Sequence, residues 1–239
     1  MKAPDLILDV GGDDPVRLRC AAVLFDMDGT LVDSHACVEW KWRTWCAGHD
    51  IDADALLAVA HGRPQAETVR IVAPELDTER ELDHLTRLEE GCTDGIVEVP
   101  GASALLSALP AGRWAVVTSA WSRLMRIRMS YAGLPLPAVT VTADDPVAGK
   151  PSPHGYLSAA ARLGVSPADC VVVEDTPVGL AAGQAAGMRT IALATTYPAD
   201  RLPAGLVVPD LTQVRLRRPE GGGPTPAPPP SATGRDRKG

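Results

Sequence analysis

Aromatic residues are scarce in this chain of 239 residues: they make up 4% of it, and Phe25 is the single phenylalanine. Binding of exposed nucleic-acid bases relies on stacking against aromatic side chains, so we do not expect it as a principal role. The core must instead consist mainly of Ala, Val, Leu and Ile. With 45% hydrophobic and 22% charged residues, the composition is close to that of average globular proteins and excludes wholesale disorder.

Long apolar runs and an excess of positive charge are also missing. No apolar run approaches the roughly 18 residues of a membrane span, and residues 1–15 contain no hydrophobic region of a signal peptide. The net charge is −7, and residues 37–98 contain fourteen acidic but only six basic side chains. Such a surface is repelled by nucleic acids and by anionic lipids. We therefore expect a cytoplasmic protein with no nucleic-acid or membrane partner, and a monomer or weak dimer.

The cysteines show no CxxC pair and no zinc-site spacing, and their number is odd. We interpret them as reduced, mostly structural thiols. They are Cys20, Cys37, Cys46, Cys92 and Cys170.

Short apolar runs between helical patterns predict an α/β fold. Because the runs are continuously apolar, they are typical of a mostly parallel, Rossmann-like sheet with helices on both faces. Gly133, Gly164 and Gly187 each follow a helical pattern, where a left-handed C-terminal cap is expected. The predicted strands are Ala21–Asp26, Trp114–Thr118, Val139–Thr142, Val171–Glu174, Thr190–Ala194 and Leu206–Val208.

One interval is too long for this alternation. Asp26 and Trp114 are 88 positions apart, whereas later strands follow at 12 to 29 positions. The intervening residues have helical patterns, notably a helix that follows Pro64 and another within Thr78–Cys92. We therefore expect a small all-helical cap inserted into the core. Trp40, Trp42 and Trp45 are expected mostly to pack in this cap or its hinge.

These patterns divide the chain into four parts. Leu6–Val10 could form an edge strand, isolated by the acidic turn that follows it. The C-terminal segment is rich in Pro and Gly and should be disordered. The expected parts are an N-terminal extension (1–18), a Rossmann-like core (19–36 and 99–215), the helical cap (37–98) and the tail (216–239).

The strongest local motif is FDMDGTLVDS, which ends the first predicted strand. Asp26 and Asp28 leave the carboxyl edge of the sheet together, and Gly29 permits a sharp turn that brings both carboxylates toward one point. Taken alone, Asp28-Gly29 is also typical of an ordinary turn with no catalytic role.

Three further motifs fall at or near the ends of other predicted strands. Thr118 and Ser119 end the second, Glu174 and Asp175 end the fourth, and Lys150 precedes a helix. Each motif alone has a structural explanation, because hydroxyls cap helices and paired acids or lysines are often solvated. Together they place carboxylates, hydroxyls and a cation where ligands of open α/β sheets bind.

Lys150 is distinctive because the chain contains only four lysines, and the other three lie in the terminal segments or the insert. A compact ammonium suits a point contact with a phosphoryl oxygen. The alternative is a structural ion pair with Glu174 or Asp175, and both roles are compatible.

The motifs FDMDGTLVDS, VVTS, GKPSPHGY and VVVEDTPVGLAAGQAAGM resemble, in order, the four motifs of the haloacid dehalogenase-like hydrolases, over about residues 20–210. AHGR at 60–63, RWAVVTS and DLTQV make the chain similar to the small-sugar and polyol phosphatases of that superfamily, such as 2-deoxyglucose-6-phosphatases and glycerol-phosphatases. The resemblance implies a Mg²⁺-dependent phosphatase with a mobile helical cap that acts on a small phosphorylated sugar or polyol.

The resemblance also implies a role for each motif residue. Asp26 is the nucleophile that forms an aspartyl-phosphate, and Asp28 is the general acid and base. Mg²⁺ is held by Asp26, the backbone carbonyl of Asp28 and Asp175, with Glu174 behind them or as an occasional ligand. Lys150, Thr118 and the backbone around Ser119 hold the phosphate. In the cap, Arg63 faces the substrate while His61 and Gly62 shape its loop, although an ordinary surface arginine is the alternative.

Three rival functions share some of these features. The similar β-phosphoglucomutases have a histidine twelve positions after the nucleophile, where this chain has Val38, and this difference favours a phosphatase. A dehalogenase needs neither the second acid nor a metal. An inactive binding module, presenting its Pro-rich tail to a partner, has no need of both Asp26 and Asp28.

Overall fold

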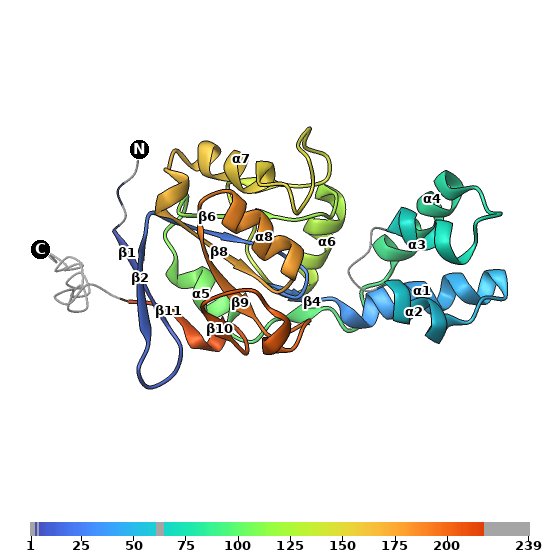
Figure 1. Ribbon diagram of the computed structural model, residues 1–239, viewed down its shortest axis with the longest axis horizontal. Coiled ribbons are helices and arrows are strands. Elements are labelled where there is room, and N and C mark those ends of the chain that lie inside the picture. Colours follow the sequence, from blue (N-terminus) through green and yellow to red (C-terminus); the bar gives the residue numbers. More distant parts are fainter. Residues whose placement is uncertain (1–2, 4, 61–64, 218–239) are drawn as a thin grey trace, which may run out of the picture.

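The computed structural model describes residues 3, 5–60 and 65–217 (Figure 1). Within these residues, one sheet has six strands in the order β10-β9-β8-β3-β6-β7, and each neighbouring pair is parallel. The six predicted strands and the Rossmann-like parallel sheet are thus confirmed. The strands are β3 (Ala22–Phe25), β6 (Trp114–Val117), β7 (Thr140–Val141), β8 (Cys170–Glu174), β9 (Arg189–Leu193) and β10 (Val207–Val208).

Helices cover both faces of this sheet because its central strands are apolar on both faces. β3, β6 and β8 are buried along their whole length. Phe25 packs in the core on the side of α5 (Ala102–Ala108) and α6 (Ser122–Tyr131). Its neighbour Leu24 packs on the opposite side, that of α7 and α8, as alternation along a strand requires. The remaining helices of this part are α7 (His154–Leu163), α8 (Pro177–Ala185) and the 3₁₀ helices η1 (Pro167–Asp169), η2 (Ala199–Arg201) and η3 (Leu211–Gln213).

The glycines expected after three helices have left-handed backbones. Gly133, Gly164 and Gly187 have φ of 68°, 70° and 72° and follow α6, α7 and α8. A side chain is strained in this conformation, so these glycines stop the helices and return the chain toward the sheet.

The helical insertion is a separate packing unit. β4 (Val32–Asp33) and β5 (Val97–Glu98) pair antiparallel at its base, so the chain enters and leaves side by side. Figure 1 shows its helices set apart from the sheet, and they enclose a core that includes Trp42, Trp45 and Leu85. The predicted helical cap is confirmed. Its helices are α1 (His35–His49), α2 (Ala53–Ala60), α3 (Gln65–Val72) and α4 (Thr78–Gly91).

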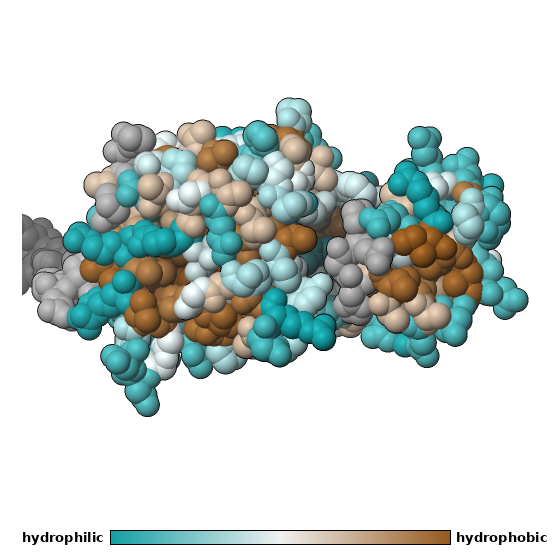
Figure 2. Space-filling model, in the orientation of Figure 1, coloured by the Kyte–Doolittle hydropathy of each residue, from teal (hydrophilic) through white to brown (hydrophobic). Residues whose placement is uncertain are grey.

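Two of the three tryptophans of α1 belong to this core. Trp42 and Trp45 are buried, with ring centroids 5.8 Å apart in an edge-to-face arrangement, whereas Trp40 is 45% exposed. The expectation that most of them pack internally is confirmed. Figure 2 shows apolar surface around α2. Within α2 itself, Leu56 is buried.

The N-terminal segment is more integrated than the sequence suggests. β1 (Leu6–Val10) is the central strand, not an edge strand, of a three-stranded antiparallel sheet ordered β11-β1-β2. The acidic turn after Val10 does not isolate it but connects it to β2 (Val16–Cys20). The other neighbour, β11 (Val214–Leu216), returns from the far end of the chain. The idea of an isolated edge strand is wrong because alternate residues of β1 pack into the main core.

Candidate active site

Asp26 and Asp28 follow β3 at the carboxyl edge of the parallel sheet. Asp26 is buried, and its backbone N–H donates to the carbonyl of Val173 in β8 at 3.0 Å. Gly29 turns the chain with a φ of 80°. A Cβ at this position would overlap the carboxylate of Asp175, so only glycine permits the close approach of the two loops.

The carboxylate of Glu174 is held at the end of β8 by several donors. Its Oε2 accepts the backbone N–H groups of Asp175 and Thr176, both at 3.0 Å, and the Thr176 hydroxyl at 2.9 Å. Gly179 of α8 leaves space for it, since a Cβ there would overlap the carboxylate. Glu174 is therefore fixed in orientation and fully buried.

Lys150 connects the acids of the two strand ends. Its Nζ donates to Oδ1 of Asp26 and, at 2.6 Å, to Oε1 of Glu174, which also accepts the Tyr156 hydroxyl at 3.1 Å. The sequence suggested an ion pair of Lys150 with either Glu174 or Asp175, and the pair with Glu174 is present. The lysine also reaches the expected nucleophile, so it neutralises charge where a phosphate would bind.

Electrostatics in this cluster is dominated by burial and by repulsion between acids. Burial raises the pKa of Asp26 well above its ordinary value; Glu174 and Asp175 add to this, while Lys150 opposes it. Burial and the charge of Glu174 raise the pKa of Asp175 to about 7. The pKa of Lys150 is well above normal because the charges of Asp26 and Glu174 outweigh its own burial. The cluster is therefore short of positive charge.

The shortage of positive charge and the carboxylate oxygens of this cluster both fit a bound divalent cation. Asp26, Glu174 and Asp175 each offer a carboxylate oxygen, and these oxygens lie within 4.8 Å of one another. Such hard oxygen ligands suit Mg²⁺. Both oxygens of Glu174 accept hydrogen bonds, Oε1 from Lys150 and Oε2 from its own neighbours, whereas the bond from Lys150 to Asp26 involves Oδ1. Asp26 and Asp175 are therefore the better ligands. The side chain of Asp28 is held by Ser34 and Arg128, which leaves its backbone carbonyl as its contribution to a metal.

Thr118 and Ser119 lie beyond β6 on the other side of Lys150. Together with Gly149 and Lys150 they line a cavity of about 210 Å³. The Thr118 hydroxyl accepts the backbone N–H of Ala120 at 3.1 Å, which fixes the turn after the strand. The structure thus brings these predicted phosphate ligands to the lysine that also contacts Asp26.

A larger cavity of about 390 Å³ lies between the sheet and the helical cap. Asp28, Asp175 and Thr196 line it from the core, and Val38 and Trp42 line it from α1. The cap therefore forms one wall of a space that opens on Asp28 and Asp175. His35, Glu39 and the α2 residues Leu57 and Ala60 complete that wall.

Arg128 of α6 is a part of the site that the sequence did not reveal. Its Nη1 donates to Oδ2 of Asp28 at 2.7 Å, and its Nη2 lies 3.5 Å from Oε1 of Glu89 in α4. Glu89 in turn accepts from Lys41 of α1 at 2.7 Å. These three charged side chains are buried, so Asp28 is connected to both helices that bound the cap. No local motif marks partners that are 39 to 100 positions apart.

The predicted cap loop cannot be placed in this way. His61, Gly62 and Arg63 lie outside the described residues, which resume at Gln65. Their proposed contact with substrate stays a prediction.

The cysteine prediction is wrong for one pair. Cys37, near the start of α1, and Cys92, just after α4, form a disulfide with Cα atoms 5.6 Å apart. The sequence gives no signal for this pair because the two residues are 55 positions apart and meet only when α1 and α4 pack together. Cys20, Cys46 and Cys170 are buried free thiols.

Comparison with known proteins places this arrangement in a family. Residues 20–187 match the family model described as haloacid dehalogenase-like hydrolase. The chain belongs to the haloacid dehalogenase-like hydrolases. The four motifs and the inserted helical cap agree with this membership, and the protein is a phosphatase of that family.

Individual relatives align with most of this chain. The chain is 41% identical to hexitol phosphatase A of Escherichia coli over 211 residues, covering 86% of this chain and 98% of the relative. It is 35% identical to glycerol-1-phosphate phosphohydrolase 2 of Saccharomyces cerevisiae over 202 residues, covering 79% and 80%. A solved hydrolase of this family from Entamoeba histolytica superposes with a TM-score of 0.69 at 22% identity, covering 80% of this chain and 93% of the other.

No helix among the described residues is long and apolar enough to cross a bilayer.

Proposed function

We propose that this phosphatase hydrolyses a phosphate monoester of a small sugar or polyol, with Mg²⁺ bound and through an aspartyl-phosphate on Asp26. The supporting observation is that Asp26 and Asp28 leave one strand together but have different surroundings. Asp26 lies against Lys150 in the buried acid cluster, whereas Asp28 borders the cavity under the cap. This separation suits a nucleophile and a general acid.

Attack by Asp26 brings a carboxylate against a phosphate dianion. Each like-charge pair at 4 Å costs about 4 kcal/mol at an effective dielectric near 20. Lys150 offsets part of this repulsion. Bound Mg²⁺, held by Asp26 and Asp175, would neutralise charge on the phosphate and on the acids. Such positioning and charge stabilisation supply most of the catalysis in phosphoryl transfer.

Asp28 moves the protons. An Asp26 oxygen bonds to phosphorus as the bond to the alcohol oxygen breaks, and Asp28 donates a proton to that leaving oxygen. Asp28 then takes a proton from water, whose oxygen bonds to phosphorus while the bond to Asp26 breaks. The hydrogen bonds from Ser34 at 2.7 Å and from Arg128 hold both oxygens of the Asp28 carboxyl group, which fixes its direction.

The phosphate would lie between Lys150 and the cavity at Thr118 and Ser119. Hydroxyl and backbone donors at the end of β6 can hold oxygens that Lys150 and the metal leave uncovered. The remainder of the substrate would occupy the cavity under the cap. At about 390 Å³ it is within the range of small-molecule sites, and Glu39, His35 and Thr196 offer polar partners for hydroxyl groups.

The choice of a sugar or polyol rests on the relatives as well as on this cavity. The names of the two relatives given above specify hexitol and glycerol phosphates. The rival phosphomutase is disfavoured by Val38, a residue of the cavity lining that stands at the sequence position where the similar mutases have a histidine. Hydrolysis is therefore favoured over transfer to a second hydroxyl.

The test is a substrate panel measured with Mg²⁺ and with a chelator. It should contain hexitol phosphates, glycerol 1-phosphate and 2-deoxyglucose 6-phosphate beside p-nitrophenyl phosphate and a phosphopeptide. We expect phosphate release to be metal-dependent and kcat/KM to be about tenfold or more higher for a polyol or sugar phosphate. Isomerised sugar phosphate without phosphate release would support the mutase, and a preference for the phosphopeptide would contradict the substrate class.

A further inference from the structure

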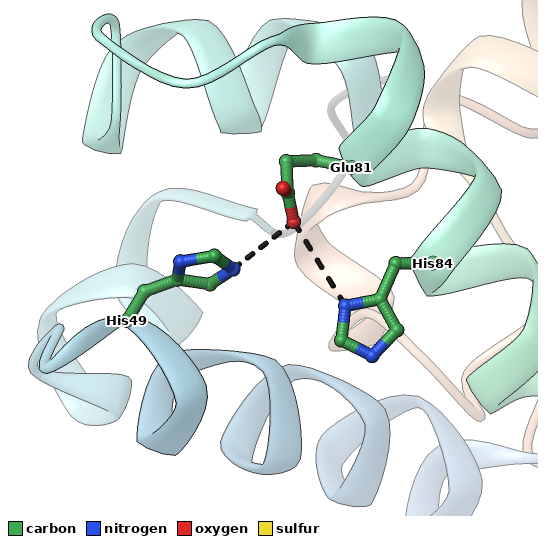
Figure 3. Close-up of side chains that lie close together, drawn as sticks. All are labelled: His49, Glu81 and His84. Atoms are coloured by element: carbon green, nitrogen blue, oxygen red, sulfur yellow. Dashed lines mark hydrogen bonds and ion pairs between the residues drawn. The ribbon is translucent and has the colours of Figure 1, made fainter.

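A second cluster of metal-ligating side chains lies inside the cap, away from the catalytic acids. His49 in the last turn of α1 faces Glu81 and His84, which lie one turn apart on α4 (Figure 3). Figure 3 shows both imidazole rings directed at the same carboxylate oxygen. Oε2 of Glu81 is 3.0 Å from Nε2 of His49 and 3.9 Å from Nδ1 of His84.

The spacing of these atoms is close to that of ligands on one ion. All three ligand atoms lie within 4.8 Å of one another. Two ligands on a tetrahedral Zn²⁺, each at its usual bond length, are about 3.3 Å apart. The pair from His49 and Glu81 meets this spacing already. Nδ1 of His84 lies 3.9 Å from Oε2 of Glu81, which is slightly more than this spacing, and its side chain is the more exposed, at 42%.

Trp45 orients two of the three groups. Its indole N–H donates to Oε2 of Glu81 at 2.8 Å, and its ring centroid lies 4.7 Å from that of His49. Burial raises the pKa of Glu81, but the hydrogen bonds from Trp45 and His49 outweigh this and bring it below its ordinary value. Partners that fix the direction and charge of a ligand are typical of metal sites.

The surroundings distinguish between classes of metal. The cluster opens into a surface hollow of about 350 Å³, which admits an ion together with water as a further ligand. Arg80 and Arg87 line the same hollow and add positive charge. A hard cation such as Ca²⁺ or Mg²⁺ prefers several oxygen ligands and would find one carboxylate in this cluster, so it is disfavoured. Zn²⁺ and similar ions bind neutral imidazole strongly and tolerate this setting.

We propose that His49, Glu81 and His84 form a binding site for Zn²⁺ or a similar transition-metal ion that is independent of the catalytic metal. Nε2 of His49, Nδ1 of His84 and a carboxylate oxygen of Glu81 are the ligands, and the remaining position is open to water. Because the ligands come from the first and last helices of the cap, the bound ion links α1 to α4. Its role is to stabilise the cap.

The experiment is calorimetric titration of the full chain with Zn²⁺ in saturating Mg²⁺, without reductant. We expect one equivalent to bind in the wild type and in Asp175→Asn, which removes a catalytic carboxylate. His49→Ala, His84→Ala and the isosteric Glu81→Gln should each weaken binding by about tenfold or more. Arg80→Ala is the matched control, because it changes the same hollow without removing a ligand, and it should retain binding.

A second readout is thermal unfolding. Zn²⁺ should raise the unfolding midpoint of the wild type and of Arg80→Ala but leave that of His84→Ala unchanged. Absence of Zn²⁺ binding, or unchanged affinity in both histidine variants, would show that the three residues are only a hydrogen-bonded cluster. Loss of binding in Asp175→Asn with retention in the cap variants would assign the zinc to the catalytic acids and overturn the proposal.

Discussion

Arg128 donates from Nη1 to Oδ2 of Asp28 at 2.7 Å, while its Nη2 lies 3.5 Å from Oε1 of Glu89 on cap helix α4. One buried guanidinium therefore contacts both the expected general acid and the cap. Because Glu89 and Lys41 belong to the cap helices α4 and α1, Arg128 connects Asp28 to the cap through buried ion pairs. This relationship suggests that catalysis is tied to cap position through Arg128.

Replacing Arg128 should therefore impair turnover more than substrate binding. For Arg128→Met we expect kcat to fall by about tenfold to a hundredfold, the range expected when a reacting group is misplaced. KM should change little. Arg126→Ala, an exposed arginine on the same helix, is the control. An unchanged kcat, or an equal loss in kcat and gain in KM, in a folded Arg128→Met protein would contradict a positioning role.

Substitution of Gly179 should lower activity by displacing Glu174. A Cβ at residue 179 would overlap the Glu174 carboxylate, which holds Lys150. We expect Gly179→Ala to displace Glu174 and lower kcat/KM by about tenfold or more. Gly205→Ala is the matched control because a Cβ there meets no atom within 4 Å. Equal activity of the two variants in steady-state assays would show that the position of Glu174 is unimportant.

The raised pKa of Asp175 predicts how the metal-free protein responds to pH. Between the ordinary value of 3.8 and about 7, the unfolded chain has released the proton of Asp175 while the folded chain retains it. The stability contributed by this group is complete below about pH 4 and is lost as the pH rises through 7. In a chelator, the wild-type unfolding midpoint should fall from pH 5 to pH 8 more steeply than that of Asp175→Asn.

The same titration affects metal affinity. Because a proton and Mg²⁺ compete for the Asp175 carboxylate, Mg²⁺ should bind more tightly as the pH rises toward 7, by up to about tenfold per unit. A calorimetric Mg²⁺ titration at several pH values measures this. Affinity that is independent of pH between 5 and 7 would show that Asp175 does not hold the metal.

The Cys37–Cys92 disulfide determines how many thiols should react, and its removal should make the fold less stable. The unfolded, unreduced protein should react at three thiols, those of Cys20, Cys46 and Cys170, and at all five cysteines after reduction. A cross-link closing a loop of this length, 55 positions, stabilises a fold by about 4 kcal/mol in the chain-entropy model. Cys37→Ser should accordingly lower the unfolding midpoint. Five reactive thiols before reduction would contradict the cross-link.

Local sequence patterns were sufficient for the parallel sheet. The predicted strands are continuous apolar runs, and Gly133, Gly164 and Gly187 end the helices between them with left-handed backbones. The long interval after Asp26 was enough to predict the helical insertion. These features depend on neighbouring residues and on spacing, which a single sequence contains.

Features that depend on distant pairing were not predictable in this way. Local patterns predict an isolated edge strand at Leu6–Val10 because its partner β11 returns from the opposite end of the chain. Likewise, the contact of Arg128 with Asp28 spans 100 positions and follows no residue spacing. In the candidate site, the motifs predicted which acids and which lysine gather at the sheet edge. The buried connection from Asp28 to the cap emerges only when α4 and α6 pack together.

The decisive measurement is where the phosphoryl group resides during turnover. The wild-type enzyme is mixed with Mg²⁺ and its best substrate, quenched in acid within the first turnovers, and digested for mass spectrometry. We predict one phosphoryl group on the peptide that contains Asp26, located on that side chain, and none in Asp26→Asn, which should also be inactive. A phosphorylated residue elsewhere, or full activity in Asp26→Asn, would contradict the assignment of Asp26 as the nucleophile.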